Sequence, residues 1–201
     1  MLKLVLGTNN PGKIREFQVL FQGLPWRLVT PEEAGVFMRV EETGSSYEEN
    51  ARTKALAYAR ASRLTALADD SGLEVDALGG LPGINSARFA GKTTDKERVE
   101  HLLSLMKDVP EGKRSARFVC VIAIATPDGR VETVRGECHG TIAFEPRGEH
   151  GFGYDPVFYF PELGKTLAEL PLDVKNRVSH RGKAAREAYR VLDRLAREAR
   201  I

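Results

Sequence analysis

Two adjacent acids, Asp69 and Asp70, are the residues of this sequence best placed to do chemistry. They follow an apolar run, residues 64–68, which has the length of a buried strand, and they fall where that strand should stop. Adjacent carboxylates at a strand end repel each other unless a positive charge lies beside them. Mg²⁺ can supply that charge, since it binds a few carboxylates together with waters and substrate phosphates. The alternative is a solvated Asp-Ser-Gly turn, and these residues alone do not decide between the two.

A second stretch, residues 7–13, reads GTNNPGK and combines residue types that suit phosphate binding. A short apolar run precedes it and apolar residues at helical spacing follow it, which predicts a strand, a polar loop and a helix start. Asn9 or Asn10 can cap that helix, and Pro11 suits its first turn. Unpaired backbone N–H groups and the helix dipole attract phosphate at such a start, and Lys13 adds a full positive charge.

The spacing of this loop is close to that of a Walker A motif, which continues with serine or threonine after the lysine. Ile14 stands at the position where that hydroxyl would hold Mg²⁺. Because an isoleucine cannot bind a metal, we reject a P-loop NTPase and keep the prediction of a phosphate-binding turn. The alternative is a capped helix start with an incidental lysine.

Two further charged clusters could complete a site for a metal-bound anion. Glu41 and Glu42 precede a helix start with a capping-box pattern, so one of them could face the Asp69-Asp70 pair; the alternative is a solvated acidic turn. Basic residues gather before and in the first turn of the C-terminal helix, where they oppose the helix dipole. They make sense if a multiply charged anion binds there, and a basic surface loop is the alternative. These residues are Lys175, His180, Arg181 and Lys183.

The stretch GFGYDP at residues 151–156 could recognise a nucleobase. Phe152 lies between two glycines and could stack on a base, because every base has a π-face. Asp155 could accept hydrogen bonds from a base edge. The alternative is that Phe152 belongs to the core and Asp155 begins a turn before Pro156.

The elements that must position these groups predict an α/β fold with a mixed sheet. Residues 115–126 should form a strand buried on both faces and central in the sheet, and residues 130–142 should return as the next strand after a hairpin turn. The stretch rich in glycine after Gly72 should form a long shaped loop, and such loops are often functional.

Composition limits the classes of function. The chain has 201 residues, 42% of them hydrophobic, and a net charge of +2, so it gives no general case for binding nucleic acid or a membrane. The first residues are too short an apolar run for a signal peptide, and no segment is long enough to span a bilayer. The two isolated cysteines, Cys120 and Cys138, favour reduced thiols in a cytoplasmic protein.

Four motifs, in order over nearly the whole chain, resemble the inosine/xanthosine triphosphate pyrophosphatase family. They read TNNPGK, ADDSGLEVDALGGLPGINSARFAG, GFGYDPVF and SHRGKA. The resemblance implies Mg²⁺-dependent hydrolysis of ITP, dITP or XTP to the monophosphate and pyrophosphate, which removes deaminated purine nucleotides. It also implies one ITPase-like domain over residues 1–201, with an elongated mixed sheet, flanking helices and two lobes around a central nucleotide cleft, and a homodimer.

The resemblance assigns roles to individual residues. Asp70 resembles the general base and a metal ligand, Glu41 (or its neighbour Glu42) resembles a second metal ligand, and Asp69 supports the same site. The triphosphate would be held by Thr8, Asn9, Asn10, Pro11, Gly12 and Lys13, with Ser71 close by. The base and sugar would be enclosed by Phe152, Gly153, Tyr154, Asp155, Lys175, His180 and Arg181. His180 and Arg181 are candidate donors to the 6-keto group of the base.

Two other functions stay open at this point. One is a related pyrophosphatase that acts on pyrimidine or other modified nucleotides, and the other is a nucleotide-binding protein without hydrolytic activity. The adjacent acids argue against the second function.

Overall fold

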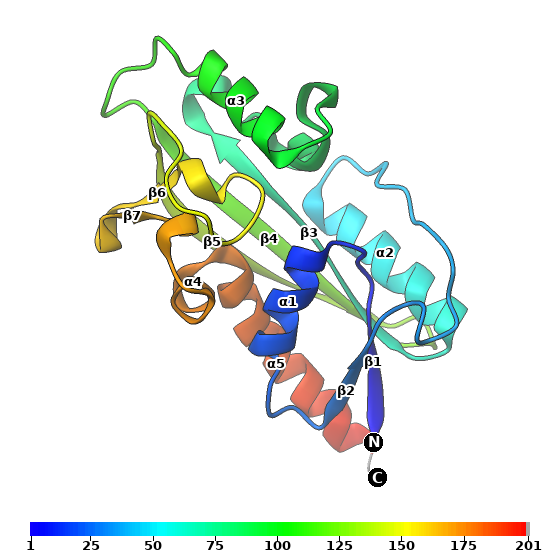
Figure 1. Cartoon of the computed structure of the whole chain (residues 1–201). Coiled ribbons are helices and arrows are strands. Elements are labelled where there is room, and N and C mark those ends of the chain that lie inside the picture. The colour runs from blue at the N-terminus through cyan, green and yellow to red at the C-terminus, as the bar shows by residue number, and fades with distance from the viewer. Residues whose placement is uncertain (200–201) are drawn as a thin grey trace. The chain divides into compact units, whose positions relative to one another are not determined.

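The computed structural model, drawn in Figure 1, describes residues 1–199. These residues divide into two compact units. Unit 1 comprises Met1–Asp70, Cys120–Gly136 and the chain from Arg181 onward, and unit 2 comprises Ser71–Val119 and Glu137–His180. In the described residues the strands form one mixed sheet of seven, in the order β2-β1-β3-β4-β5-β6-β7. The α/β fold with a mixed sheet is therefore confirmed, whereas the single domain and the nucleotide cleft stay predictions.

Unit 1 is built on a parallel βαβ arrangement. β1 (Leu2–Leu6) lies between β2 (Trp26–Val29) and β3 (Thr65–Val75) and is parallel to both. α1 (Pro11–Leu20) connects β1 to β2, and α2 (Tyr47–Ser62) precedes β3. The carboxyl ends of parallel strands meet at one edge of a sheet, so the loop after β1 lies beside the middle of the longer β3.

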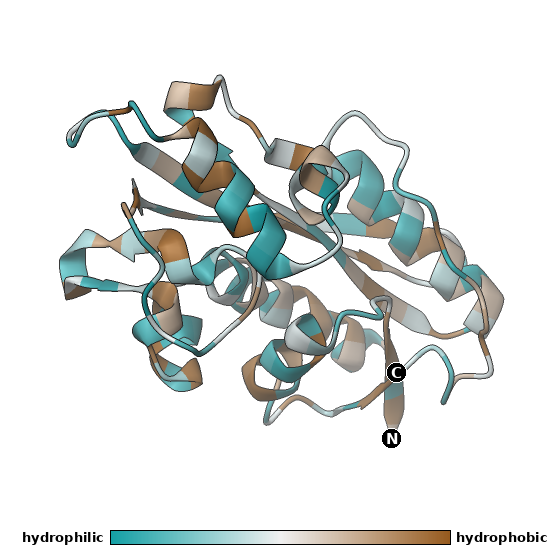
Figure 2. Cartoon of the chain, turned by 45° about the horizontal axis from the view of Figure 1, so that its top comes forward, coloured by the Kyte–Doolittle hydropathy of each residue, from teal (hydrophilic) through white to brown (hydrophobic). Residues whose placement is uncertain are grey.

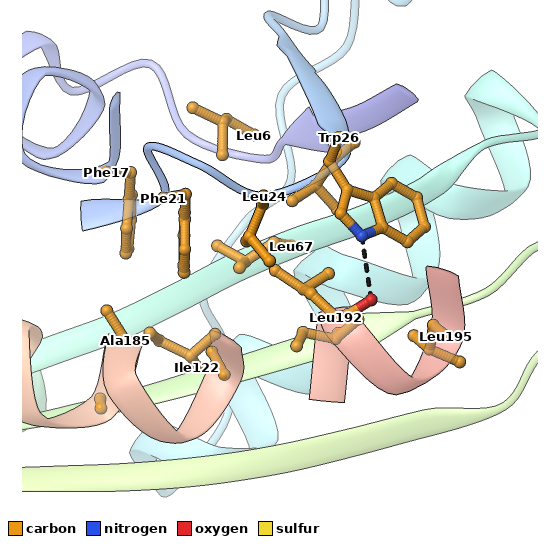
Figure 3. Close-up of a cluster of buried hydrophobic side chains, with 14 of the residues drawn as sticks. Leu6, Phe17, Phe21, Leu24, Trp26, Leu67, Ile122, Ala185, Leu192 and Leu195 are labelled. Carbon is orange, nitrogen blue, oxygen red and sulfur yellow. Dashed lines mark hydrogen bonds between the residues drawn. The ribbon is translucent and has the colours of Figure 1, made fainter. Parts of the chain in front are cut away.

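One face of these strands packs against α1 and α5 (His180–Glu198). Alternate strand residues, Leu6 and Leu67 among them, share a buried apolar cluster with both helices (Figure 3). The indole Nε1 of Trp26 donates a hydrogen bond of 2.9 Å to the carbonyl oxygen of Leu192, which ties β2 to α5. The core therefore holds the two helices in fixed places over β3.

The opposite face of β1 and β3 lies under α2. The residues that alternate onto this face are small, with Ala66 and Ala68 fully buried. A side chain at Gly7 would come within 2.7 Å of the Tyr58 ring. These small residues let α2 approach the strands closely, which brings its polar side chains within reach of β3.

Unit 2 has a separate apolar core. β4 (Ser115–Ala125) is central in the sheet, and β5 (Val131–Ile142), β6 (Phe158–Phe160) and β7 (Lys165–Thr166) follow it toward one edge. The helices of this region are α3 (Asp95–Leu105) and α4 (Leu172–Val178). Along the helices hydrophilic and hydrophobic residues alternate, as expected of helices with one buried face (Figure 2).

The strand predicted before the loop at residues 7–13 is confirmed as β1. The strands predicted at 115–126 and 130–142 are also confirmed, including the central place of the first of these two. The prediction that a strand stops at the two acids is wrong, because β3 continues from Thr65 through Val75. The stretch rich in glycine is also more regular than predicted, since it includes 3-10 turns at Asp76–Leu78 and Gly83–Gly91. α4 was not predicted, because its seven residues are too few to show a helical period.

Between residues 1 and 199, none of the helices has the length and apolar character that crossing a membrane requires.

Candidate active site

The loop between β1 and α1 is shaped by its own side chains. The Asn10 side chain caps α1 by accepting hydrogen bonds from the backbone N–H groups of Gly12 (2.9 Å) and Lys13 (3.2 Å). The Thr8 hydroxyl oxygen accepts from the Asn10 N–H at 3.1 Å, and Pro11 opens the helix without an N–H group. The predicted helix start is thus confirmed with Asn10 as its cap.

The capping has a consequence for phosphate binding. The N–H groups of Gly12 and Lys13 already have an acceptor, so the prediction of unpaired N–H groups at this helix start is wrong for these two residues. The positive charge of the loop comes from the Lys13 side chain and the helix dipole instead. Asn9 is exposed on the same loop.

Asp69 lies at the centre of a buried charge network. Its Oδ2 accepts hydrogen bonds from Lys13 Nζ (3.0 Å) and Arg181 Nη2 (3.3 Å), and Arg181 also pairs with Glu16 of α1 at 2.7 Å. Glu16, Asp69 and Arg181 are each about 1% exposed. Burial by itself raises the pKa of Asp69, but the charges of Lys13, Arg181 and Lys54 outweigh it and hold that pKa well below its usual range. Asp69 is therefore an ionised anchor for Lys13.

The environment of Asp70 has the opposite effect on its pKa. Its Oδ2 accepts a hydrogen bond of 2.9 Å from the Asn50 side chain of α2, and the residue is only 4% exposed. Burial, reinforced by the nearby negative charge of Glu42, raises the pKa of Asp70 to about 6 despite opposing effects of Asn50, Lys54 and Lys13. Asp70 is thus suited to accept a proton near neutral pH.

Strand geometry explains why the adjacent residues Asp69 and Asp70 have such different pKa values. Successive side chains of a strand point to opposite faces, so Asp69 shares the face of Leu67 and meets α1 and α5, while Asp70 shares the face of Ala68 and meets α2. Two carboxylates whose environments push their pKa values apart are typical of a divided acid–base role.

The acidic segment before α2 reaches Asp70 through Glu42. Lys54 of α2 pairs with Glu42 and donates a hydrogen bond of 2.6 Å to the Asp69 carbonyl oxygen. Glu42 also raises the pKa of Asp70, whereas the Glu41 side chain is exposed. The geometry therefore favours Glu42 over Glu41 as the second carboxylate.

Two site residues escaped the sequence analysis, namely Asn50 and Lys54. The Asn50 side chain donates to Asp70 and also accepts from the Gly44 N–H at 2.8 Å, so it fixes Asp70 and the acidic segment together. A signal was present, because Asn50 and Lys54 are four residues apart and share the buried side of α2 with Ala51 and Ala55.

Unit 2 contributes a second group of predicted residues. Asp155 Oδ2 accepts from Lys175 Nζ at 2.6 Å and from the Phe152 N–H at 3.1 Å, and Asp155 and Lys175 are each 2% exposed. Lys175 Nζ lies 4.8 Å from the centre of the Phe152 ring. The structure brings these three residues together, with Asp155 bonded inside its own loop, and direct contact of Asp155 with a base stays a prediction.

The remaining predicted residues fall in different places. Tyr154 is buried, and Gly153 bonds α3 through its N–H. His180 stacks on Phe118 in unit 2, with ring centres 4.6 Å apart. Arg181 belongs to unit 1, where it binds Glu16 and Asp69 as described. Ser71 follows Asp70 in β3 and is half-buried.

No group of three or more His, Cys, Asp or Glu side chains among residues 1–199 is arranged to hold a metal ion. Mg²⁺ does not need such a group, because it keeps waters and takes substrate phosphates besides one or two carboxylates. Asp70 and Glu42 fit that requirement. The negative charge of Glu42 raises the pKa of Asp70, so a cation bound by both carboxylates would relieve their repulsion.

The comparisons with known proteins agree on one family. The profile of the Ham1 family matches residues 4–191. A dITP/XTP pyrophosphatase of Desulforamulus reducens is 52% identical over 195 residues, covering 96% of this chain and 97% of that protein. The dITP/XTP pyrophosphatase of Bacillus subtilis is 43% identical, and the match covers 96% of this chain and 98% of that protein. Among solved structures, a HAM1 protein from Coxiella burnetii has a TM-score of 0.86 at 43% identity. The match covers 96% of this chain and 98% of that structure.

We predict that Asp70→Asn stabilises the metal-free protein at pH 8. Because the pKa of Asp70 is raised to about 6 in the folded state, its ionisation costs folding free energy. This cost grows as the pH rises from about 4 to 6, is complete above that range and is nearly absent below it. An amide carries no such cost, so the free energy of unfolding in EDTA should rise by about 1–2 kcal/mol at pH 8 and change little at pH 3.5. Urea denaturation of both proteins at both pH values measures this difference in the free energy of unfolding.

The matched control is Asp69→Asn, which should destabilise the protein at both pH values. Its carboxylate is ionised and paired with buried Arg181 and with Lys13, so its loss removes the charge that Lys13 pairs with and leaves buried Arg181 with Glu16 alone. An Asp70→Asn variant less stable than the unsubstituted protein at pH 8 would contradict the assigned environment.

Proposed function

The chain belongs to the Ham1 family, and from that membership we propose that it is a nucleoside triphosphate pyrophosphatase acting on ITP, dITP and XTP. It hydrolyses these deaminated purine nucleotides to the monophosphate and pyrophosphate, which clears them from the nucleotide pool. The names of the relatives support the substrate class. The observation that carries the proposal is the divided pair in β3, an ionised Asp69 beside Lys13 and a proton-accepting Asp70 beside Glu42.

The residues of unit 1 divide the work at the phosphates. Lys13, held by Asp69, supplies a fixed positive charge, and Thr8 and Asn10 hold the loop that carries it. A water attacks the α-phosphorus, the bond from that phosphorus to the bridging oxygen breaks, and pyrophosphate leaves. Asp70 takes the proton of the water. Its pKa of about 6 in the metal-free protein makes it ionised at neutral pH, and a bound cation would lower that pKa together with the pKa of the attacking water.

A divalent cation, Mg²⁺, would be held by Asp70 and Glu42 together with the phosphates. When bound, it would neutralise phosphate charge and lower the pKa of the attacking water. Lys54 supports this arrangement, because it pairs with Glu42 and holds the backbone of Asp69. Phosphoryl transfer depends on such positioning and charge neutralisation more than on covalent catalysis.

The residues of unit 2 supply groups for the base. The Phe152 ring offers a stacking surface, and Lys175 and Asp155 hold it in place. Hypoxanthine and xanthine carry a 6-keto group where adenine carries an amine. Donors aimed at that oxygen, for which His180 and Arg181 are the candidates, would lose their partner with adenine, and such a loss gives strong rejection.

The protein works as a cytoplasmic homodimer in this proposal. The free thiols of Cys120 and Cys138, both buried, fit a reducing compartment. Light scattering coupled to size-exclusion chromatography tests the dimer: the expected mass is about twice the 22.2 kDa of one chain, and a mass of one chain at micromolar concentration would contradict it.

The reaction is tested with a panel of ITP, XTP, GTP, ATP and dTTP in Mg²⁺ and in EDTA. We expect Mg²⁺-dependent pyrophosphate from ITP and XTP, at least tenfold faster than from ATP, and no orthophosphate. In water enriched in ¹⁸O the label should appear in the monophosphate, since the attack is at the α-phosphorus. Orthophosphate would indicate cleavage at the γ-phosphate, faster turnover of dTTP would favour a pyrimidine enzyme, and no turnover would indicate a binding protein.

The metal ligand is tested by comparing Glu42→Gln with Glu41→Gln. Glu42→Gln should raise the Mg²⁺ concentration for half-maximal ITP turnover by tenfold or more and remove most of the Mg²⁺-dependent rise in melting temperature, because binding to the folded state stabilises it. Glu41→Gln, with its exposed side chain, should stay within twofold of the unsubstituted enzyme. The reverse result would return the role to Glu41.

A further inference from the structure

The segment that joins β3 to α3, with its 3-10 turns and many glycines, has no part in the function described so far. Two hydrogen bonds connect this segment and the start of α3 to the Phe152 loop, residues 151–155. The Tyr154 hydroxyl donates to the Ser86 carbonyl oxygen at 2.7 Å, and the Gly153 N–H donates to Asp95 Oδ2 at 2.8 Å. All these residues belong to unit 2.

The contact through Ser86 is part of the core. The Ser86 hydroxyl donates to the Gly83 carbonyl oxygen at 2.6 Å and accepts from the Leu73 N–H of β3 at 2.9 Å. Tyr154 is 4% exposed, and burial raises the pKa of its hydroxyl, which therefore stays a donor. This bond fixes the buried end of the Phe152 loop to the sheet.

The contact through Asp95 is at the surface and is oriented by a neighbour. Asp95 is the first residue of α3, and its Oδ1 accepts from Arg98 Nη2 at 2.7 Å while Oδ2 accepts from Gly153. Arg98 also donates to the Lys92 carbonyl oxygen at 2.9 Å. With Oδ1 held by Arg98, the carboxylate keeps Oδ2 directed at the loop.

The Gly153 N–H belongs to the peptide unit that directly follows Phe152. The ψ angle of Phe152 sets the orientation of this peptide relative to the Phe152 side chain, so a peptide held from outside the loop limits the directions that the ring can take. Gly153 has a φ of +62°, a conformation that glycine adopts freely, so its backbone alone does not hold the peptide in place. The hydrogen bond from the Gly153 N–H to Asp95 supplies the restraint that the Gly153 backbone lacks.

We propose that Asp95 is a positioning residue for nucleobase discrimination, which it sets by holding the Gly153 N–H and so the Phe152 ring. The inference rests on the proposed function, in which Phe152 stacks on the base. Without the bond the Phe152 loop is held only from the side of Asp155 and Lys175, the ring samples a wider range of directions, base contacts weaken, and the enzyme loses part of its preference for 6-keto purines. The groups assigned to the phosphates lie in unit 1, so kcat should change much less than KM.

The test compares Asp95→Ala with Asp95→Asn. The alanine variant removes the acceptor; the asparagine variant removes the negative charge, and with it the ion pair to Arg98, but keeps an oxygen that can accept from Gly153. For Asp95→Ala we expect a fivefold or larger rise in KM for ITP, a kcat within twofold and a several-fold lower ratio of kcat/KM for ITP over ATP. Asp95→Asn should restore most of the ratio.

Glu97→Ala is the matched control for stability. Glu97 lies in the same first turn of α3 and completes the capping box with Thr94, so its loss weakens the same helix end. Melting temperatures should fall for Glu97→Ala and for Asp95→Ala alike. Only Asp95→Ala should change the ITP-to-ATP ratio.

The remaining outcomes distinguish a failure of the inference about Asp95 from a failure of the proposed function. Phe152→Ala should lower the ITP-to-ATP ratio, and if it does while Asp95→Ala leaves the ratio unchanged, the inference about Asp95 is wrong and the proposed function stands. If Asp95→Asn behaves like Asp95→Ala, the charge at the helix start acts instead of the bond, and the inference is also wrong. If the unsubstituted enzyme does not discriminate ITP from ATP, the proposed function is wrong and this inference with it.

Discussion

The buried carboxylate of Asp69 is the interaction on which the arrangement of unit 1 depends. It joins β3 to α1 through Lys13 and to α5 through Arg181, and Arg181 in turn binds Glu16 of α1. Charges so deeply buried lose their hydration, and only close opposite charges compensate that loss. An apolar core of the same volume could stabilise the fold as well. The network is therefore better understood as a device that fixes Lys13 beside the loop between β1 and α1, which we propose binds the phosphates.

A single strand delivers two different carboxylates because its side chains alternate between faces. The face of Asp69 meets cations on α1 and α5, and the face of Asp70 meets an amide and another acid from the α2 side. Moving the register by one residue would exchange the two environments. The same alternation demands small residues next to Asp70, since Ala66 and Ala68 leave room for α2 to bring Asn50 close.

The sequence allowed the local features to be predicted where a few adjacent residues decide them. The helix cap at Asn9 or Asn10 and the central strand 115–126 depend on short-range chemistry and periodicity, and both were found. The end of β3 was misjudged because two adjacent acids normally indicate solvent. Their burial depends on cations from distant parts of the chain, which no local pattern reveals. Lys54 was missed for the same reason, since its partners lie in a preceding loop and a following strand.

The same distinction applies to the acidic segment. Glu41 and Glu42 are equivalent as sequence, and the choice between them depends on where the chain turns before α2. The bond from the Gly44 N–H to the Asn50 side chain fixes that turn, and a side chain at residue 44 would meet the Asn50 oxygen at 2.6 Å. A side chain at this point would therefore displace the Asn50 amide. Asn50 thus couples the position of Glu42 to the orientation of Asp70, so the two carboxylates are placed by one buried amide.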